Sequence, residues 1–152
     1  MITFLFICHG LCAIALLGAI THQAAAVWIP VRKGSASFFT RFRAVKAAGY
    51  VNAVIVLFLI TFIIGSIIYP TYRTGARIYM EDLRMSAPVG AFEVKEHLVS
   101  FGLALLPAYW YYWRLPQKPE DNGARKGVVL VLAAIIWAAF LTGHVLNNIK
   151  GI

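Results

Sequence analysis

The stretch "VKEHLVSFGLALLPAYWYYW", from Val94 to Trp113, joins a charged beginning to an apolar run that ends in aromatic residues. Its 20 residues match the roughly 20 that a helix needs to cross about 30 Å of hydrocarbon. Aromatic side chains are enriched where a membrane helix meets the lipid headgroups. The stretch therefore predicts a transmembrane helix, with His97 near its charged end and Trp110 to Trp113 at the other interface.

The rest of the chain has the same apolar character. Hydrophobic residues make up 61% of the 152 residues and charged residues only 13%, which is far from globular averages. Because lipid cannot satisfy backbone N–H and C=O groups, apolar runs of this length must form helices. We expect an all-α integral membrane protein in which residues 1–152 form one transmembrane domain, a four-helix bundle with up-down topology. The expected helices cover about residues 2–29, 47–69, 92–113 and 127–149, and Pro70 is expected to end the second before an outer loop over 71–91.

The charged residues predict the orientation in the membrane. The connection between the first two helices holds five basic residues and no acidic one, and such connections stay in the cytoplasm. The next connection mixes arginine with aspartate and glutamate, so it is expected outside. Both termini are then on the extracytoplasmic side of the cell's inner (cytoplasmic) membrane. The net charge of +8 reflects this topology and contact with anionic membrane lipids, and nothing in the chain resembles a nucleic-acid site.

The four histidines are the main functional candidates, because ionisable side chains inside membrane helices are costly and mark functional sites. His9, His97 and His144 are expected near the outer ends of three different helices. His22 comes 13 residues after His9 in the same helix, so at 1.5 Å per residue it lies roughly 20 Å deeper. The sequence therefore predicts three imidazoles at one level and a fourth elsewhere.

Convergent imidazoles in an apolar helix bundle can bind a haem iron from two sides. This arrangement resembles the four-helix membrane b-type cytochromes, in which histidines on transmembrane helices bind one or two haems and transfer electrons to or from quinone. The resemblance covers the bundle and the histidine placement, most of the chain, without a family-specific motif. It implies one outer haem b. The haem is expected to be noncovalent, since "CHGLC" (Cys8 to Cys12) is not the CxxCH attachment sequence.

The sequence leaves the axial ligands open. In an up-down bundle the first and third helices are diagonal, which favours His9 with His97. His144 is an alternative ligand or a partner for a haem propionate. His22 is expected to form a hydrogen bond with Asn52 at a comparable depth, and a second haem there requires some other residue to complete the site.

Two charged residues next to His97 have a role in this hypothesis. Lys95 can pair with a haem propionate, and Glu96 can orient an imidazole. Both residues equally fit a solvated helix start at the interface, where charges reach water easily.

We therefore expect a haem b-binding subunit that transfers electrons between quinone and a periplasmic redox partner within a larger respiratory-type complex. Such a subunit belongs to an oxidoreductase without being an enzyme by itself, and hydrolase and kinase signatures are missing. One alternative is a copper-binding or copper-handling membrane protein. It rests on the neighbouring Cys8, His9 and Cys12, with Met80 and Met85 on the outer side. The other alternative is a non-catalytic accessory subunit whose histidines only pack and form hydrogen bonds.

Overall fold

The chain folds into long helices joined by short helical turns. The structure is a computed structural model that describes residues 1–29, 46–114, 116 and 118–150. The long helices are α1 (Ile2–Trp28), α3 (Val51–Thr71), α5 (Ser86–Arg114) and α6 (Asn122–Lys150). The shorter elements are the 3₁₀-helix η1 (Ala47–Tyr50), the π-helix η2 (Tyr72–Arg77), α4 (Ile78–Asp82) and the 3₁₀-helix η3 (Pro119–Asp121). The all-α prediction is confirmed. Most of the first basic connection lies outside the described residues.

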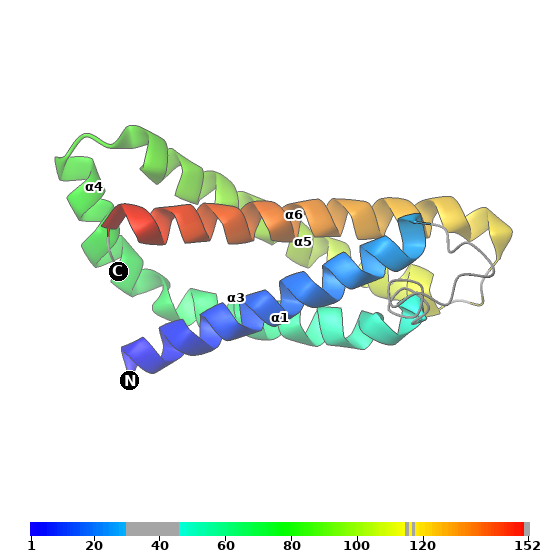
Figure 1. Cartoon of the computed structure of the whole chain (residues 1–152). Coiled ribbons are helices and arrows are strands. Elements are labelled where there is room, and N and C mark those ends of the chain that lie inside the picture. The colour runs from blue at the N-terminus through cyan, green and yellow to red at the C-terminus, as the bar shows by residue number, and fades with distance from the viewer. Residues whose placement is uncertain (30–45, 115, 117, 151–152) are drawn as a thin grey trace.

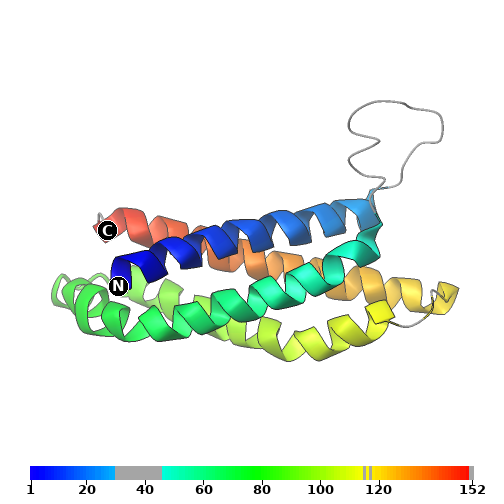
Figure 2. The ribbon, with the colours of Figure 1, turned by 90° about the horizontal axis from the view of Figure 1, so that it is seen from below.

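The four long helices lie side by side and alternate in direction (Figure 1 and Figure 2). The N-terminus and the end of α6 lie at the same end of the bundle, together with α4, and we call this the termini end. The opposite end carries η1 and η3, and we call it the connection end. Helix α1 packs on α3 and α6, while α5 packs extensively on α6 and less on α3. Helices α1 and α5 are therefore diagonal to each other.

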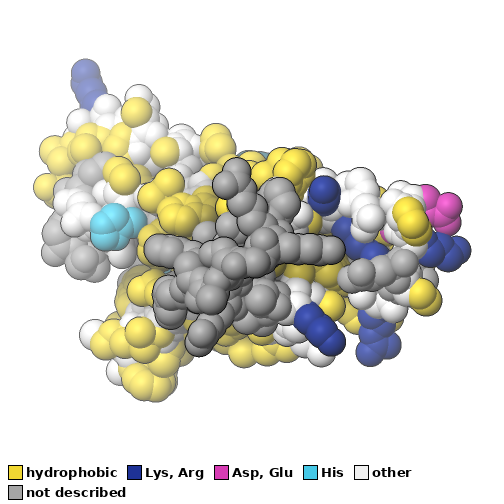
Figure 3. Space-filling view, turned by 45° about the vertical axis from the view of Figure 1, so that its right-hand side comes forward, with side chains coloured by type: hydrophobic (Ala, Val, Ile, Leu, Met, Phe, Trp, Pro, Cys, Tyr) yellow, Lys and Arg dark blue, Asp and Glu magenta, His cyan; other side chains and the backbone are white. Residues whose placement is uncertain are grey.

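Within the described residues, three helical segments are long and apolar enough to cross a membrane: Ile2–Trp28, Ala47–Asp82 and Pro119–Asn148. Helix α5 is not among them, although the sequence predicts a fourth span over 92–113. The physical reason is its polar first half, which contains Glu93, Lys95, Glu96 and His97. Hydrophobic side chains are spread widely over the described part of the face in Figure 3, and its lysines and arginines gather mainly to one side. Such an apolar surface fits contact with membrane lipid.

The region predicted as an outer loop over 71–91 is mostly helical instead. Helix α3 passes through Pro70 and continues into η2 and α4, and α5 already begins at Ser86. Proline removes one backbone donor, and the π-helical turn that follows Pro70 changes the hydrogen-bond register locally. The Thr74 hydroxyl donates to the Pro70 carbonyl at 2.9 Å. The helix persists because the loss of one backbone bond is absorbed within a single turn.

A tight turn at Arg84 joins α4 to α5. Arg84 has a φ of 55°, which is left-handed backbone. The Met85 N–H donates to the Met80 carbonyl at 2.8 Å, and the Arg84 N–H donates to the Glu81 carbonyl at 2.9 Å. These two bonds form the Schellman motif that commonly ends a helix. The turn directs α5 back along α6, so the charged first half of α5 lies at the termini end.

A buried polar clamp joins α1, α5 and η1 toward the connection end. The Tyr109 hydroxyl donates to Gln23 Oε1 at 2.6 Å, and Gln23 Nε2 donates to the Ala47 carbonyl at 3.1 Å. Both side chains have 0% exposure. The surrounding core takes apolar residues from all four long helices, among them Ile20, Val54, Phe58, Leu106, Val129 and Leu132. Because a buried polar atom without a partner is costly, the clamp fixes how these three elements meet.

The clamp predicts the effect of removing one hydroxyl. Tyr109→Phe should lower the free energy of unfolding by about 1–3 kcal/mol, because Gln23 Oε1 loses its donor in a buried position. Unfolding in mixed detergent micelles measures this change. Tyr111→Phe is the matched control, since Tyr111 is exposed. Equal stability of the two variants would contradict the clamp.

Gly102 sets the distance between α5 and its two neighbours. A Cβ on Gly102 would lie 2.9 Å from Phe58 Cζ of α3 and 3.2 Å from Ile135 Cγ2 of α6. Gly102→Ala is therefore expected to cost about 1–3 kcal/mol of stability through overpacking. Gly10→Ala serves as control, because nothing lies within 4 Å of the added methyl group. Thermal unfolding should show a lower midpoint only for Gly102→Ala; similar midpoints would mean that the helices separate freely.

Candidate functional site

Two close contacts define one level at the termini end of the bundle. A Cβ placed on Gly65 of α3 would lie 3.1 Å from His9 Cε1 of α1. A Cβ placed on Gly143 of α6 would lie 3.6 Å from Lys95 Nζ of α5. The Lys95 ammonium lies near enough to the His9 ring to repel its protonated form. All four long helices therefore meet at this level, where two glycines make room for two polar side chains.

The other two histidines expected at this level, His97 and His144, lie close to it. His97 is two residues from Lys95, and His144 is adjacent to Gly143. At 1.5 Å per residue these offsets amount to about 3 Å and about 1.5 Å along the helices. The histidines of α1, α5 and α6 thus share one depth in the bundle.

The three imidazoles differ in direction. His9 is half-buried beside Gly65, whereas His97 and His144 are exposed. On α5 it is Lys95 that is turned toward α6 and interacts with His9. The choice of His9 and His97 as a ligand pair stays a prediction.

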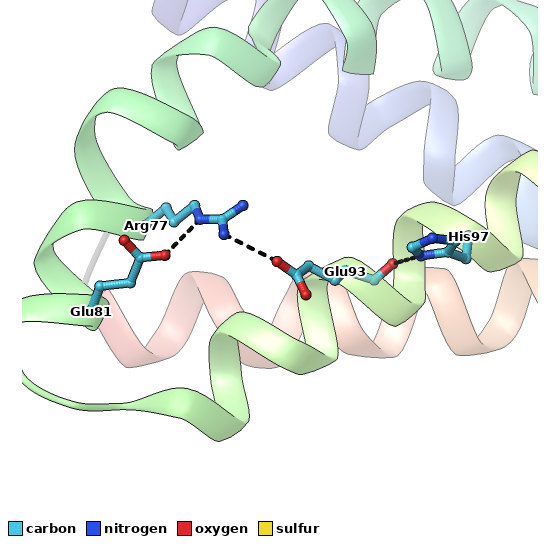
Figure 4. A network of polar contacts seen from close by, with 4 residues as sticks. All are labelled: Arg77, Glu81, Glu93 and His97. Atoms are coloured by element: carbon cyan, nitrogen blue, oxygen red, sulfur yellow. Dashed lines mark hydrogen bonds and ion pairs between the residues drawn. The ribbon is translucent and has the colours of Figure 1, made fainter.

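The His97 ring is held by its own helix. Its Nδ1 lies 2.7 Å from the Glu93 carbonyl oxygen, so an Nδ1–H donates this bond and leaves the Nε2 lone pair free. The Glu93 carboxylate accepts from Arg77 Nη2 at 3.1 Å, and Arg77 Nε donates to Glu81 at 2.8 Å (Figure 4). The oxygen that binds the His97 ring is the backbone carbonyl of Glu93, whereas the sequence predicts that Glu96 orients an imidazole. Glu96 is half-buried and interacts electrostatically with Lys95.

The remaining histidines contact aromatic rings. His144 stacks on Phe140 of the same helix, with ring centroids 6.4 Å apart. His22 stacks on Tyr50 at 4.8 Å, close to the connection end, while Asn52 is exposed. The expected hydrogen bond between His22 and Asn52 stays a prediction.

Several buried polar atoms near the termini end have no hydrogen-bond partner. Among the described residues they include His9 Nδ1, Thr61 Oγ1 and Tyr72 OH. Thr61 lies one turn from Gly65 on α3, and its backbone interacts with the His9 ring. Tyr72 stacks on Phe92 of α5 at 3.6 Å. Buried polar groups are normally paired, so these atoms depart from the usual pattern.

Sequence reasoning missed Thr61 and Gly65 as well as the inward direction of Lys95. The available signal was one threonine and one glycine within the apolar run "FLITFIIGSII", Phe58 to Ile68. Small and weakly polar residues also serve ordinary helix packing in membranes, so the run by itself does not show that they face His9.

A compact metal centre finds no support in the described part of the chain. It contains no group of three or more His, Cys, Asp or Glu side chains that could hold a metal ion. Cys8 and Cys12 are free thiols. The copper alternative, which relies on Cys8, His9 and Cys12 as one cluster, therefore has no geometric support. A haem iron requires only two axial side chains, which is fewer than the three that such a metal group would contain.

The ring directions predict an order of chemical modification. Diethyl pyrocarbonate should modify His97 and His144 faster than His9, because their imidazoles are exposed and the His9 ring is covered by Gly65. Peptide mass spectrometry of the purified protein after short exposures measures the three rates. Modification of His9 at the rate of His97 would show that its ring turns outward.

No protein-family model matches the chain, and no curated protein or solved structure shows significant similarity to it.

Proposed function

We propose that the chain is a haem b-binding membrane subunit that transfers electrons between quinone and a periplasmic redox partner. The observation that carries this proposal is the His97 ring, whose Nδ1 lies 2.7 Å from the Glu93 carbonyl oxygen, which leaves Nε2 as the nitrogen that a metal would use. Metal-ligating histidines commonly donate their other N–H to such a carbonyl, which fixes the tautomer and the ring orientation. A bound haem would supply one-electron transfer at its iron.

The donor set at this level fits a haem in its chemistry. Three imidazoles at one depth, that of His9 half-buried and those of His97 and His144 exposed, outnumber the two axial nitrogens that the iron requires. His97 is the first proposed ligand, and His9 is the preferred second, with His144 as the alternative. Apolar side chains on the surrounding helices match the flat, apolar faces of a porphyrin.

Arg77 supports this arrangement from η2. Arg77 forms an ion pair of 3.1 Å with the Glu93 carboxylate. This pair restrains the turn of α5 in which the Glu93 carbonyl orients the His97 ring. A second bond to Glu81 at 2.8 Å fixes the guanidinium itself. Arg77 is therefore a positioning residue in this proposal, acting through Glu93 on the ligand.

The proposal extends to orientation and assembly. The acid-free basic connection after α1 favours the cytoplasmic side for the connection end, so both termini face the extracytoplasmic side of the inner membrane. Glu93 and His97 are exposed on α5, and ionisable groups at membrane depth rarely face lipid. This polar face supports contact with another subunit of a larger redox complex.

A reduced-minus-oxidised absorption spectrum of the gently extracted protein tests the function. We expect a b-type α band in the native protein and its loss, by at least about tenfold in amplitude, in His97→Ala, because second-shell and ligand changes weaken metal sites by 10- to 100-fold. Ser100→Ala, an exposed position on the same helix, should keep the band.

Elemental analysis of the same preparation separates the alternatives. Iron equimolar with the α band supports the haem subunit. Copper without haem, lost in a Cys8→Ala and Cys12→Ala variant, would instead support copper handling. Native protein that carries neither metal after gentle extraction would overturn the proposal in favour of an accessory subunit.

A further inference from the structure

We propose that Trp28 and Lys126 form the headgroup end of a binding site for one anionic phospholipid, whose acyl chains lie along α6 as far as Trp137. The site is on the outside of the bundle, where α1 and α6 pack together. It involves none of the histidines and does not depend on a haem. The site recognises a phosphate at the membrane surface and a hydrocarbon chain beneath it.

The headgroup end lies where the last turn of α1 meets the start of α6. The Trp28 indole N–H donates to the Lys126 carbonyl at 3.2 Å, and Lys126 Nζ lies 5.7 Å from the centroid of the same indole ring. One tryptophan thus joins the two helices and holds a cation over its face. Both side chains are exposed, so the ammonium is held beside the helix junction and can be reached from the membrane.

The Lys126 ammonium favours an anionic ligand. None of the ion pairs among the described residues includes Lys126. Basic side chains close to the membrane surface attract anionic lipids. A zwitterionic lipid gains less, because its own choline cation offsets the charge of its phosphate. Lys126 is therefore expected to distinguish an anionic headgroup from a zwitterionic one.

An exposed apolar strip on α6 continues from Lys126 toward the middle of the helix. Leu130, Ala134 and Trp137 follow at spacings of 4, 4 and 3 residues, which keep them on one face of a helix. All three are exposed. The Trp137 indole N–H donates to Thr21 Oγ1 of α1 at 2.9 Å. The strip therefore meets α1 at both of its ends and offers hydrocarbon contact between them.

The length of this strip matches one leaflet of a bilayer. Lys126 and Trp137 are 11 residues apart, which at 1.5 Å per residue is about 17 Å. Half of a hydrocarbon core of roughly 30 Å is about 15 Å. A phospholipid with its phosphate at Lys126 therefore ends its chains near Trp137. Tryptophan usually lies at the membrane interface, so an exposed tryptophan that is bonded to another helix at mid-depth indicates a specific contact for the chains.

Native mass spectrometry of the full chain in detergent tests the site by titration with phosphatidylglycerol and with phosphatidylcholine of the same acyl chains. We expect one phosphatidylglycerol to bind more tightly than further copies and more tightly than phosphatidylcholine. Lys126→Gln should lower the phosphatidylglycerol affinity about fivefold, the contribution of one basic residue near an anionic surface. The phosphatidylcholine affinity should stay the same. Unchanged phosphatidylglycerol binding in Lys126→Gln would overturn the site.

Arg114→Gln is the matched control for the lost charge. Arg114 is also exposed, and its guanidinium carbon lies 4.7 Å from the Trp110 ring centroid, but this pair lies within α5 alone. Its replacement should leave the tightly bound phosphatidylglycerol in place. An equal loss of affinity in Arg114→Gln and Lys126→Gln would show attraction to the whole basic surface, and would overturn a site at Trp28.

Trp137→Leu tests the contact with the acyl chains. The affinities of both phospholipids should fall by a few fold, because the two lipids carry the same chains. Trp110→Leu, an exposed position on α5, should change neither affinity. Unchanged affinities in a folded Trp137→Leu protein would overturn the proposed position of the chains. Should Trp137→Leu fail to fold, the exposed change Lys126→Gln decides.

Inorganic phosphate distinguishes a lipid from a soluble anion. Phosphatidylglycerol should raise the thermal midpoint of the native protein, because a ligand that binds only the folded state stabilises it, and inorganic phosphate at the same concentration should not. An equal rise with phosphate would overturn the lipid as the occupant. Phosphatidylglycerol binding by protein without an α band would overturn the haem subunit alone, and an α band without selective phosphatidylglycerol binding would overturn only this site.

Discussion

The rest of the structure depends on one constraint: a polar group inside an apolar bundle needs a partner within the protein, because lipid offers none. The connection end meets this constraint completely at its clamp, where Tyr109, Gln23 and the Ala47 carbonyl form bonds of 2.6 and 3.1 Å. Arg125 adds bonds to the Tyr112 and Pro116 carbonyls at 2.7 and 3.1 Å, which satisfy the end of α5. These bonds hold α1, α5, η1 and the start of α6 together at the connection end.

The termini end satisfies the constraint only in part. The first half of α5 brings charges to the level of apolar helices, and the Arg77 pairs with Glu81 and Glu93 neutralise some of them. His9 Nδ1 and Thr61 Oγ1 are buried there without a hydrogen-bond partner in the described structure. The connection end also holds a buried donor without a partner among the described residues, the Trp113 Nε1–H, so it is the three histidines and the charged half of α5 that direct a functional interpretation to the termini end.

The proposed haem ligation relies on His97, whose ring is oriented by the Glu93 carbonyl, and so concerns the exposed face of α5. Lys95 is only two residues away but turned by about 200° around the helix, and its ammonium lies against Gly143 of α6. Neighbouring residues on one helix thus present an imidazole outward and an ammonium toward another helix.

The sequence by itself determined the helical class, the approximate extent of the apolar helices and the common depth of His9, His97 and His144, because hydrophobic length and rise per residue are local properties. Only the tertiary structure decided that the helix continues through Pro70, that α5 begins at Ser86, and that the Lys95 ammonium lies against Gly143 of α6. Those features depend on which neighbour each helix meets and at what rotation. Gly65, Gly102 and Gly143 set that rotation through contacts with residues distant in the chain, and no periodicity within a single apolar run encodes such contacts.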